Sequence, residues 1–290
     1  RPPRSTLFPY TTLFRSGLRE LGLGHTQLAA SGLDALSPLT GLSGLHLDGL
    51  AGLTDLSALA GLTGLRHLGL SDTGVRDLKP LAGLVELRTL KLTRAPVTDL
   101  SPLAKLKNLH SLYLQETKIA DLSPLRGLAG LRWLHAARTP VANLAPLSGL
   151  GLTTLDLDGT KVRQISDLRG CLRLERLFLG DTAVSDLTPL SGLPLQFLDL
   201  SRTKITAIGP LAQVPALVSL SLAHTAVKDL APLAGLPALE ALDLTGVSLT
   251  RPAQVLDLAH LKKLVFTDRL LEPAVRQALA ARGVELVPVP

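Results

Sequence analysis

The residues whose types could support chemistry are His135, Asp156 and Ser111. A serine, a histidine and a carboxylate within hydrogen-bond reach of one another form a nucleophilic triad. His135 and Asp156 occupy the same position of two consecutive sequence repeats, so their side chains are expected to meet. Ser111 occupies a different position, and its surroundings contain no pattern typical of a nucleophile turn or an oxyanion loop. We therefore predict no enzymatic activity and no catalytic residues in this chain.

A second candidate for chemistry is the set of carboxylates at Asp156, Asp158 and Asp199. Calcium prefers oxygen ligands but needs six or more of them, and no loop that would supply the others is present in the sequence. The histidines are spread over separate repeats without the spacing of metal ligands. Solvated or salt-bridged carboxylates are the favoured interpretation, and neither a metal nor a cofactor is predicted.

All these residues belong to one repeated unit. Residues 65–86 read LRHLGLSDTGVRDLKPLAGLVE, with apolar residues at positions 0, 3, 5, 10, 13, 16 and 19, Thr at position 8 and Asp at position 12. A short unit is expected from Leu45 to Gly64. Regular copies, spaced by 22 or 21 residues, then begin at Leu65, Leu87, Leu109, Leu131, Leu152, Leu174, Leu195 and Leu217. This period is the signature of a leucine-rich solenoid. The first residues of each repeat are expected to form a strand. In this strand the leucines at repeat positions 3 and 5 point inward, and the residues at repeat positions 2 and 4 point outward.

Two polar rows of the repeat have a structural explanation. The Asp at position 12, as in Asp77, precedes a short helical turn, where its carboxylate is predicted to accept a hydrogen bond from the Lys79 amide. The Thr at position 8, as in Thr73, follows the strand, where its hydroxyl is predicted to satisfy backbone groups of the turn. Neither row is assigned to catalysis or metal binding.

The chain divides into three parts. Residues 6–16, TLFPYTTLFRS, resemble the translation of a sequencing-library adapter, so we assign residues 1–16 to an adapter-derived artefact and exclude them from the fold. The sequence contains no Met, and we expect the natural protein to begin upstream. Residues 17–249 form the predicted repeat array. Residues 250–290, with a predicted helix at 273–282 stopped by Gly283, form a predicted C-terminal cap.

Composition limits the partners. The formal charge is +6, but three of the 30 basic residues lie in the lead, which has no acidic residue; the remainder has 27 basic and 24 acidic residues. This small excess argues against a nucleic-acid partner. No apolar run approaches the ~18 residues of a membrane span, so no membrane insertion is predicted. The single Cys171 is expected to be buried in the core and indicates no compartment. We expect a monomer and leave its localisation open.

The repeat L-x-x-L-x-L-x-x-T-x-V-x-D-L-x-P-L-x-G-L closely resembles the 22-residue leucine-rich repeats of bacterial internalins. The resemblance covers residues 18–249, with Thr where many members have Asn. It implies an α/β solenoid, a right-handed horseshoe with parallel strands on the concave face and short helical or 3-10 turns on the convex side. It also implies protein binding on the concave face. A parallel β-helix, the rival fold, lacks this regular Asp-Leu-x-Pro-Leu segment.

The outward positions 2 and 4 are where a ligand is expected. Four of the five aromatic residues outside the lead fall on these positions, and Phe266, in the cap, is the fifth. The four are expected to form two neighbouring pairs, Tyr113 with Trp133 and Phe178 with Phe197, because adjacent strands lie ~4.8 Å apart. Exposed aromatic side chains are typical binding anchors, although strands also favour aromatics for packing alone. We predict a ligand-binding patch with these members: Tyr113, Trp133, His135, Asp156, Arg176, Phe178, Phe197 and Asp199. A protein ligand is favoured; the alternatives are a glycan on the same patch, or a role as the recognition arm of a larger enzyme whose N-terminal part is missing.

Overall fold

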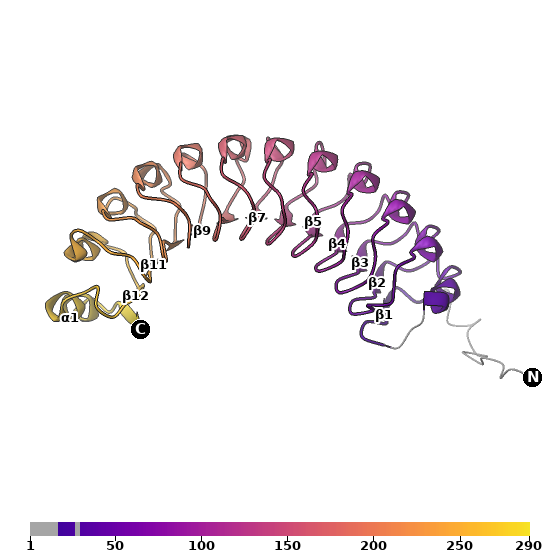
Figure 1. Cartoon of the computed structure of the whole chain (residues 1–290), viewed down its shortest axis with the longest axis horizontal. Coiled ribbons are helices and arrows are strands. Elements are labelled where there is room, and N and C mark those ends of the chain that lie inside the picture. The colour runs from indigo at the N-terminus through magenta and orange to yellow at the C-terminus, as the bar shows by residue number, and fades with distance from the viewer. Residues whose placement is uncertain (1–16, 27–29) are drawn as a thin grey trace, which may run out of the picture.

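The computed structural model describes residues 17–26 and 30–290. The adapter-like segment at residues 1–16 lies outside the described residues. The described chain forms a curved, open solenoid in which the strands line the inner side of the arc and the helical turns line the outer side (Figure 1). The predicted leucine-rich-repeat solenoid is thereby confirmed.

Within the described residues, thirteen parallel strands form one sheet in chain order, each pairing with the strand of the unit before and after it. The strands are β1 (Glu20–Gly22), β2 (Gly44–His46), β3 (His67–Gly69), β4 (Thr89–Lys91), β5 (Ser111–Tyr113), β6 (Trp133–His135), β7 (Thr154–Asp156), β8 (Arg176–Phe178), β9 (Phe197–Asp199), β10 (Ser219–Ser221), β11 (Ala241–Leu244), β12 (Lys263–Thr267) and β13 (Glu285–Val289). The central leucines pair along the sheet, as Leu68 does with Leu90 and Leu90 with Leu112. This in-register ladder places equivalent residues of successive units side by side.

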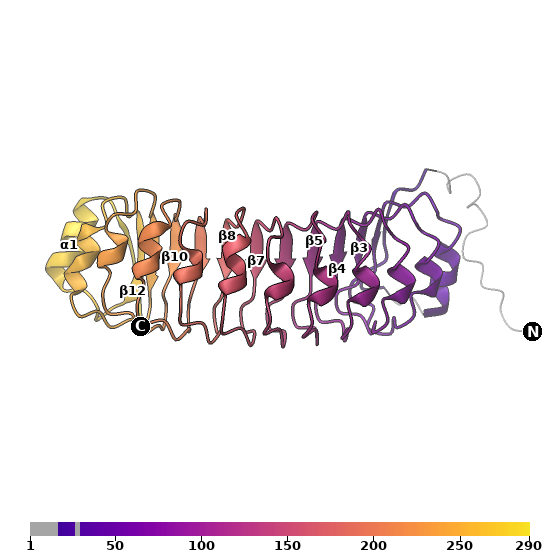
Figure 2. The same ribbon diagram turned by 90° about the horizontal axis from the view of Figure 1, so that it is seen from above.

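Short 3-10 turns follow most strands, and one α-helix lies near the C-terminus. They are η1 (Ala30–Leu36), η2 (Ser57–Leu59), η3 (Lys79–Leu81), η4 (Ser101–Leu103), η5 (Ser123–Leu125), η6 (Ala145–Leu147), η7 (Ser166–Gly170), η8 (Thr188–Leu190), η9 (Gly209–Gln213), η10 (Ala231–Leu233), η11 (Pro252–Asp257) and α1 (Pro273–Ala281). Figure 2 shows these turns in one row across the back of the strands. A proline such as Pro80 fits the first turn because it needs no hydrogen-bond acceptor there. The helical backs are wider than the strand spacing of ~4.8 Å, so the stack curves toward the strands.

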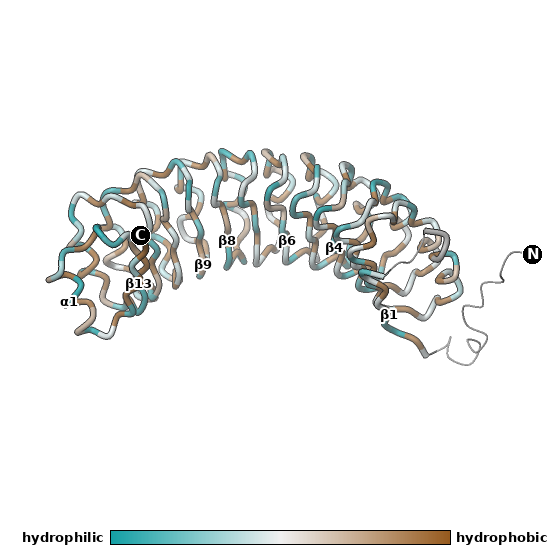
Figure 3. Tube along the Cα trace, turned by 60° about the horizontal axis from the view of Figure 1, so that its bottom comes forward, coloured by the Kyte–Doolittle hydropathy of each residue, from teal (hydrophilic) through white to brown (hydrophobic). Residues whose placement is uncertain are grey.

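The core is one continuous column of leucines between the sheet and the turns. In the unit that begins at residue 65, Leu65, Leu68, Leu70, Val75 and Leu78 are each at most 1% exposed. Hydrophobic and hydrophilic residues alternate within every unit (Figure 3). Cys171, at a leucine position, is also buried, as predicted. Because each unit buries its apolar side only against its neighbours, stability is shared along the array.

The turns after most strands use two devices. The first is a backbone with positive φ, which the described residues show at eight non-glycine positions: His25, Asp72, Arg94, Glu116, Arg138, Asp181, Arg202 and His224. The second is the buried threonine that follows: the Thr73 hydroxyl donates to the Leu70 carbonyl at 2.7 Å. The same bond recurs at Thr117, Thr139, Thr160, Thr182, Thr203 and Thr225. The structural role predicted for this row is confirmed.

The aspartate row also behaves as predicted. Asp77 accepts a hydrogen bond from the Lys79 amide at 2.9 Å, and the same contact is made by Asp99, Asp121, Asp186 and Asp229. One leucine separates each carboxylate from its turn, so the motif is an Asx turn leading into the helix. The Ser101 hydroxyl and amide both donate to Asp99, and these hydrogen bonds lower the pKa of that carboxyl.

The two ends of the array are less regular than its middle. Near the N-terminus, the register aligns Leu45 with Leu68, so this unit begins at Leu42 and not at Leu45. Near the C-terminus, the sheet continues beyond residue 249, where β12 and β13 pair over five residues and α1 replaces the 3-10 turn. Gly283, with a φ of 78°, follows the helix as predicted. In the described part of the chain, every helix is too short or too polar to cross a lipid bilayer.

Candidate functional site

The predicted patch occupies two parallel columns on the exposed face of the sheet, across β5 to β9. At the strand starts the column is Ser111, Trp133, Thr154, Arg176 and Phe197; at the strand ends it is Tyr113, His135, Asp156, Phe178 and Asp199. All eight predicted residues therefore lie on one surface. The strands carrying them line the inner side of the arc (Figure 1).

The first cluster joins Tyr113, His135 and Asp156. The Tyr113 and His135 rings stack at a centroid distance of 4.8 Å and an interplanar angle of 3°, and His135 Nδ1 lies 3.5 Å from Asp156 Oδ2. The predicted meeting of His135 and Asp156 is thus observed. Tyr113 was expected to form a pair with Trp133, but the register places it against His135 instead. Ser111 lies in the other column, opposite Trp133.

The second cluster contains Phe178, Phe197 and Arg176. The two phenyl rings lie 4.9 Å apart at an angle of 37°, so this predicted pair is observed. The Arg176 guanidinium lies 4.9 Å from the Phe197 ring and 5.8 Å from the Phe178 ring. Such cation–π contacts hold an exposed arginine in place while leaving its donors in solvent.

Trp133 lies on β6 beside the first cluster and is 43% exposed. Its neighbours in the same column are Ser111 and Thr154, both small, so neither side chain covers the indole. The patch therefore presents one uncovered ring beside the first cluster, two strands away from Arg176 of the second cluster. This geometry separates the four aromatics into one exposed anchor and three half-buried supports.

The carboxylates of the patch also serve the backbone. Strand-end amides that the ladder leaves unpaired donate to them: the Asp158 amide to Asp156 Oδ1 at 3.2 Å, and the Ser201 amide to Asp199 Oδ1 at 2.8 Å. Asp243 makes the same contact with the Thr245 amide. Asp156 and Asp199 thus have a structural task that holds them in position on the surface.

Asp158 belongs to this cluster although it was not among the predicted site residues. Its Oδ1 accepts a hydrogen bond from the Gly180 amide at 2.6 Å. Burial, together with the neighbouring charges of Asp156 and Asp199, raises the pKa of its carboxyl to about 7. A Cβ at Gly180 would lie 3.2 Å from that carboxylate oxygen, so the glycine makes room for the contact. The sequence signal for this contact is that Asp158 and Gly180 occupy the same position of two consecutive units.

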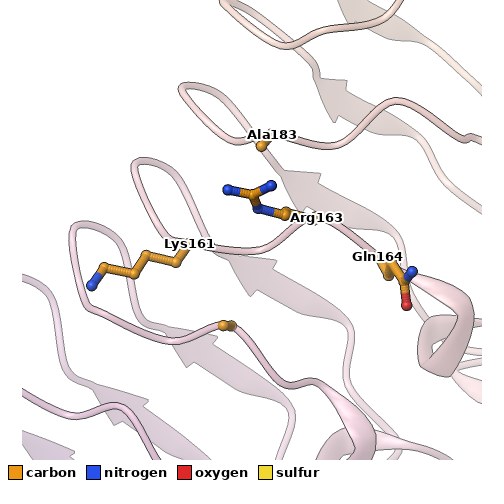
Figure 4. Close-up of a pocket in the computed structure, with 5 residues that line it drawn as sticks. Lys161, Arg163, Gln164 and Ala183 are labelled. Atoms are coloured by element: carbon orange, nitrogen blue, oxygen red, sulfur yellow. The ribbon is translucent and has the colours of Figure 1, made fainter.

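No three His, Cys, Asp or Glu side chains within the described ranges are arranged to hold a metal ion. A hollow of about 490 Å³ lies away from the patch and is lined by Ala142, Lys161, Arg163, Gln164 and Ala183. Figure 4 shows Arg163 directed toward Ala183 while Lys161 extends outward. None of the predicted site residues lines it.

The fold and its exposed strand face define a leucine-rich-repeat solenoid, a protein-interaction module; proteins of this class are typically non-enzymatic. A family model described as "Leucine Rich repeats (2 copies)" matches residues 85–127. Among solved structures, internalin C2 of Listeria monocytogenes is 31% identical, with a TM-score of 0.54, over 71% of this chain and 82% of that one. Internalin F of the same organism is 24% identical, with a TM-score of 0.75, over 95% of this chain and 88% of that one.

A leucine-rich-repeat protein of Leptospira interrogans has the same fold, with 18% identity and a TM-score of 0.75 over 93% of this chain and 84% of that one. A search of curated protein sequences found no match. On the identity and coverage shared with internalin C2, the chain belongs to the internalin-like family of bacterial leucine-rich-repeat proteins.

Proposed function

We propose that the chain is a monomeric binding module that holds a protein ligand on its concave face, around Trp133. The observation that carries this proposal is the uncovered indole, which is 43% exposed on the same face as two packed aromatic clusters. Tryptophan, tyrosine and arginine are the residues most enriched among binding hot spots, and a hot spot needs surrounding groups that exclude water. Tyr113 lies on the neighbouring strand β5 and Arg176 lies two strands away on β8, so a ligand that covers Trp133 would reach both.

The charges of the patch favour a protein over a nucleic acid. Asp156, Asp158 and Asp199 lie within the same three consecutive units as Arg176 and would repel phosphates. Mixed charge beside aromatic rings suits a protein epitope, in which basic side chains can meet the carboxylates. Because a single flat ring can also stack on a sugar, a glycan is the second candidate, and Trp133 is the observation that favours it.

The experiment compares residues 17–290 with two variants in a pull-down from cell lysates and glycan mixtures. The first variant carries alanine at Tyr113, Trp133, Phe178 and Phe197. The matched control carries alanine at His46, His67 and Thr89, which occupy the same columns on β2 to β4. Circular dichroism and thermal unfolding must show that all three are equally folded.

A protein retained by the parent and the control, but lost by the aromatic variant, supports the proposal. If the parent and the control retain a glycan that the aromatic variant loses, the glycan-binding candidate replaces the protein-binding proposal. Equal retention of every ligand by all three proteins moves the binding site away from the concave aromatics.

A further inference from the structure

The small net charge of the chain conceals an asymmetry between the two long edges of the solenoid. We define the strand-start edge as the segments that lead into strands β3 to β6, namely residues 66, 82–88, 104–110 and 126–132. The strand-end edge comprises the segments that leave the same strands, residues 71–77, 93–99, 115–121 and 137–143. The first contains six Lys and Arg residues, one His and one carboxylate, Glu86; the second contains four basic and five acidic residues.

The basic residues of the strand-start edge form a ladder along the solenoid. The Arg88 amide donates to the Arg66 carbonyl at 2.8 Å, the His110 amide to Arg88 at 2.8 Å, and the Arg132 amide to His110 at 2.9 Å. These four residues therefore stand in consecutive units, ~4.8 Å apart per strand. Lys105, Lys107 and Arg126 lie in the loops behind them.

The cations of this ladder lack carboxylate partners. The Arg132 guanidinium and the Lys107 ammonium donate only to backbone carbonyls, at Ala129 and Leu131 and at Gly127. No ion pair involves any of the six Lys and Arg side chains within residues 17–26 and 30–290. On the strand-end edge, by contrast, Arg94 pairs with Asp72, and Arg138 lies 3.8 Å from Glu116.

We propose that the strand-start edge from Arg66 to Arg132 is a second docking surface, which binds an acidic segment of a protein partner. Like charges held in adjacent units repel one another, and a row of carboxylates relieves that repulsion. The row has a fixed direction and spacing, which suits an extended acidic segment lying along the solenoid axis.

Two observations select an acidic protein over other polyanions. The segments of the strand-start edge contain no aromatic residue, whereas proteins that bind single-stranded nucleic acids stack bases on aromatic side chains. The edge is also continuous with the concave patch, because Arg132 immediately precedes Trp133. This second argument rests on the proposed function: a protein that covers Trp133 would reach the ladder with its adjoining surface.

The test uses a fluorescein-labelled peptide of twenty glutamates and measures its binding by fluorescence anisotropy at 50 and 300 mM NaCl. The parent is residues 17–290. The strand-start variant is R66E/R88E/R132E. The control, R76E/K118E/R163E, makes the same change in net charge on the strand-end side, at residues that form no ion pair among those described. A fourth protein carries alanine at the four concave aromatics.

The parent is expected to bind at 50 mM salt and more weakly at 300 mM, since exposed charges are screened. The strand-start variant should lose about tenfold or more in affinity, because three attractive contacts become repulsive. The control and the aromatic variant should stay within about twofold of the parent on the same electrostatic argument. Retained binding in the aromatic variant separates this proposal from that for the concave face.

Three results would overturn the proposal. The first is no binding by the parent at 50 mM salt. The second is equal loss in the strand-start variant and the control, which would mean that only net charge matters. The third comes from a parallel titration with a twenty-nucleotide thymidine DNA: tighter binding than the peptide, persisting at 300 mM, would assign the edge to nucleic acid.

Discussion

The concave face has two regions built on the same backbone but with different surfaces. Across β5 to β9 the outward columns carry aromatic rings and charges that touch one another. Across β1 to β4 they carry Gly22, Gly44 and Gly69, and a hollow of about 240 Å³ opens beside Glu20 and His67. His46 Nε2 lies 3.8 Å from Glu20 Oε2 in this region. Beneath both regions runs the same ladder of buried leucines.

The comparison shows that folding and recognition use alternate residues of the same strands. Leu45 and Leu155 are both fully buried at the same position of their units. The core position is therefore occupied in the same way in the two regions. The surface differs only at positions that contribute little to the core. A binding surface can therefore change along the array without a change in the fold.

The largest expected effect tests whether the two regions have equivalent cores. Leu155→Ala in β7 and Leu68→Ala in β3 each remove a side chain that is at most 1% exposed. Both should lower the free energy of unfolding by about 2–5 kcal/mol, measured by urea denaturation followed by circular dichroism. A loss below about 1 kcal/mol in only one of them would show that the regions are not packed alike.

The next effect is a loss of stability with rising pH that originates at Asp158, in the β7–β9 region. The pKa of Asp158 is raised from 3.8 to about 7 in the folded chain, so the folded state holds its proton where the unfolded state has lost it. Stability from this group is complete below about pH 4, falls as the pH rises to about 7, and is constant above. Asp158→Asn should flatten this profile and raise the melting temperature at pH 8.

The position-matched control for Asp158 is Asp48, which accepts a hydrogen bond from the Ser71 amide at 2.8 Å. Asp48→Asn removes a charge-assisted hydrogen bond without separating crowded carboxylates, so it should not raise the melting temperature at pH 8. If Asp48→Asn raises the melting temperature at pH 8 as much as Asp158→Asn does, the crowding of carboxylates around Asp158 is not the cause of the increase.

A smaller effect concerns the threonine row, which is common to both regions. Thr182→Val deletes the hydroxyl that donates to the Leu179 carbonyl at 2.6 Å, and Thr73→Val deletes its counterpart to Leu70. Each should cost about 1–2 kcal/mol, because the buried carbonyl loses its partner. Thermal unfolding measures both, and unequal losses would show that the turns differ in burial or rigidity.

The smallest effect is expected at the solvent-exposed Asx turns. Asp99→Ala removes the acceptor of the Ser101 amide and should cost about 0.5–1 kcal/mol. Asn143 makes the equivalent contact with the Ala145 amide at 3.0 Å without a charge. Asp99→Asn should therefore recover most of the loss; if it recovers none, the charge and not the hydrogen bond stabilises the turn.

Much of the fold could be predicted because the repeat aligns every residue with its counterparts. The leucine ladder, the threonine bonds and the aspartate turns each depend on one position of a single unit, so the spacing alone places them. The start of the second unit at Leu42 was missed because irregular spacing near the N-terminus allows two alignments, and only strand pairing distinguishes them.

The site was less predictable because its contacts join different units. The stack of Tyr113 on His135 follows from the register once columns are compared, but residue type suggested Trp133 as the partner. The crowding around Asp158 depends on the missing side chain of Gly180 and on burial, which no single repeat reveals. Ligand binding by the patch stays a prediction.

The in-register parallel ladder has a mechanical consequence. Its strand-to-strand hydrogen bonds run along the solenoid axis, so tension between the two ends would load the outermost pair of strands first and peel the array one unit at a time. A released 22-residue unit would extend to about 75 Å at ~3.4 Å per residue, replacing one strand spacing of ~4.8 Å. Under tension the molecule would therefore lengthen in a series of steps of similar size, one for each unit that unfolds.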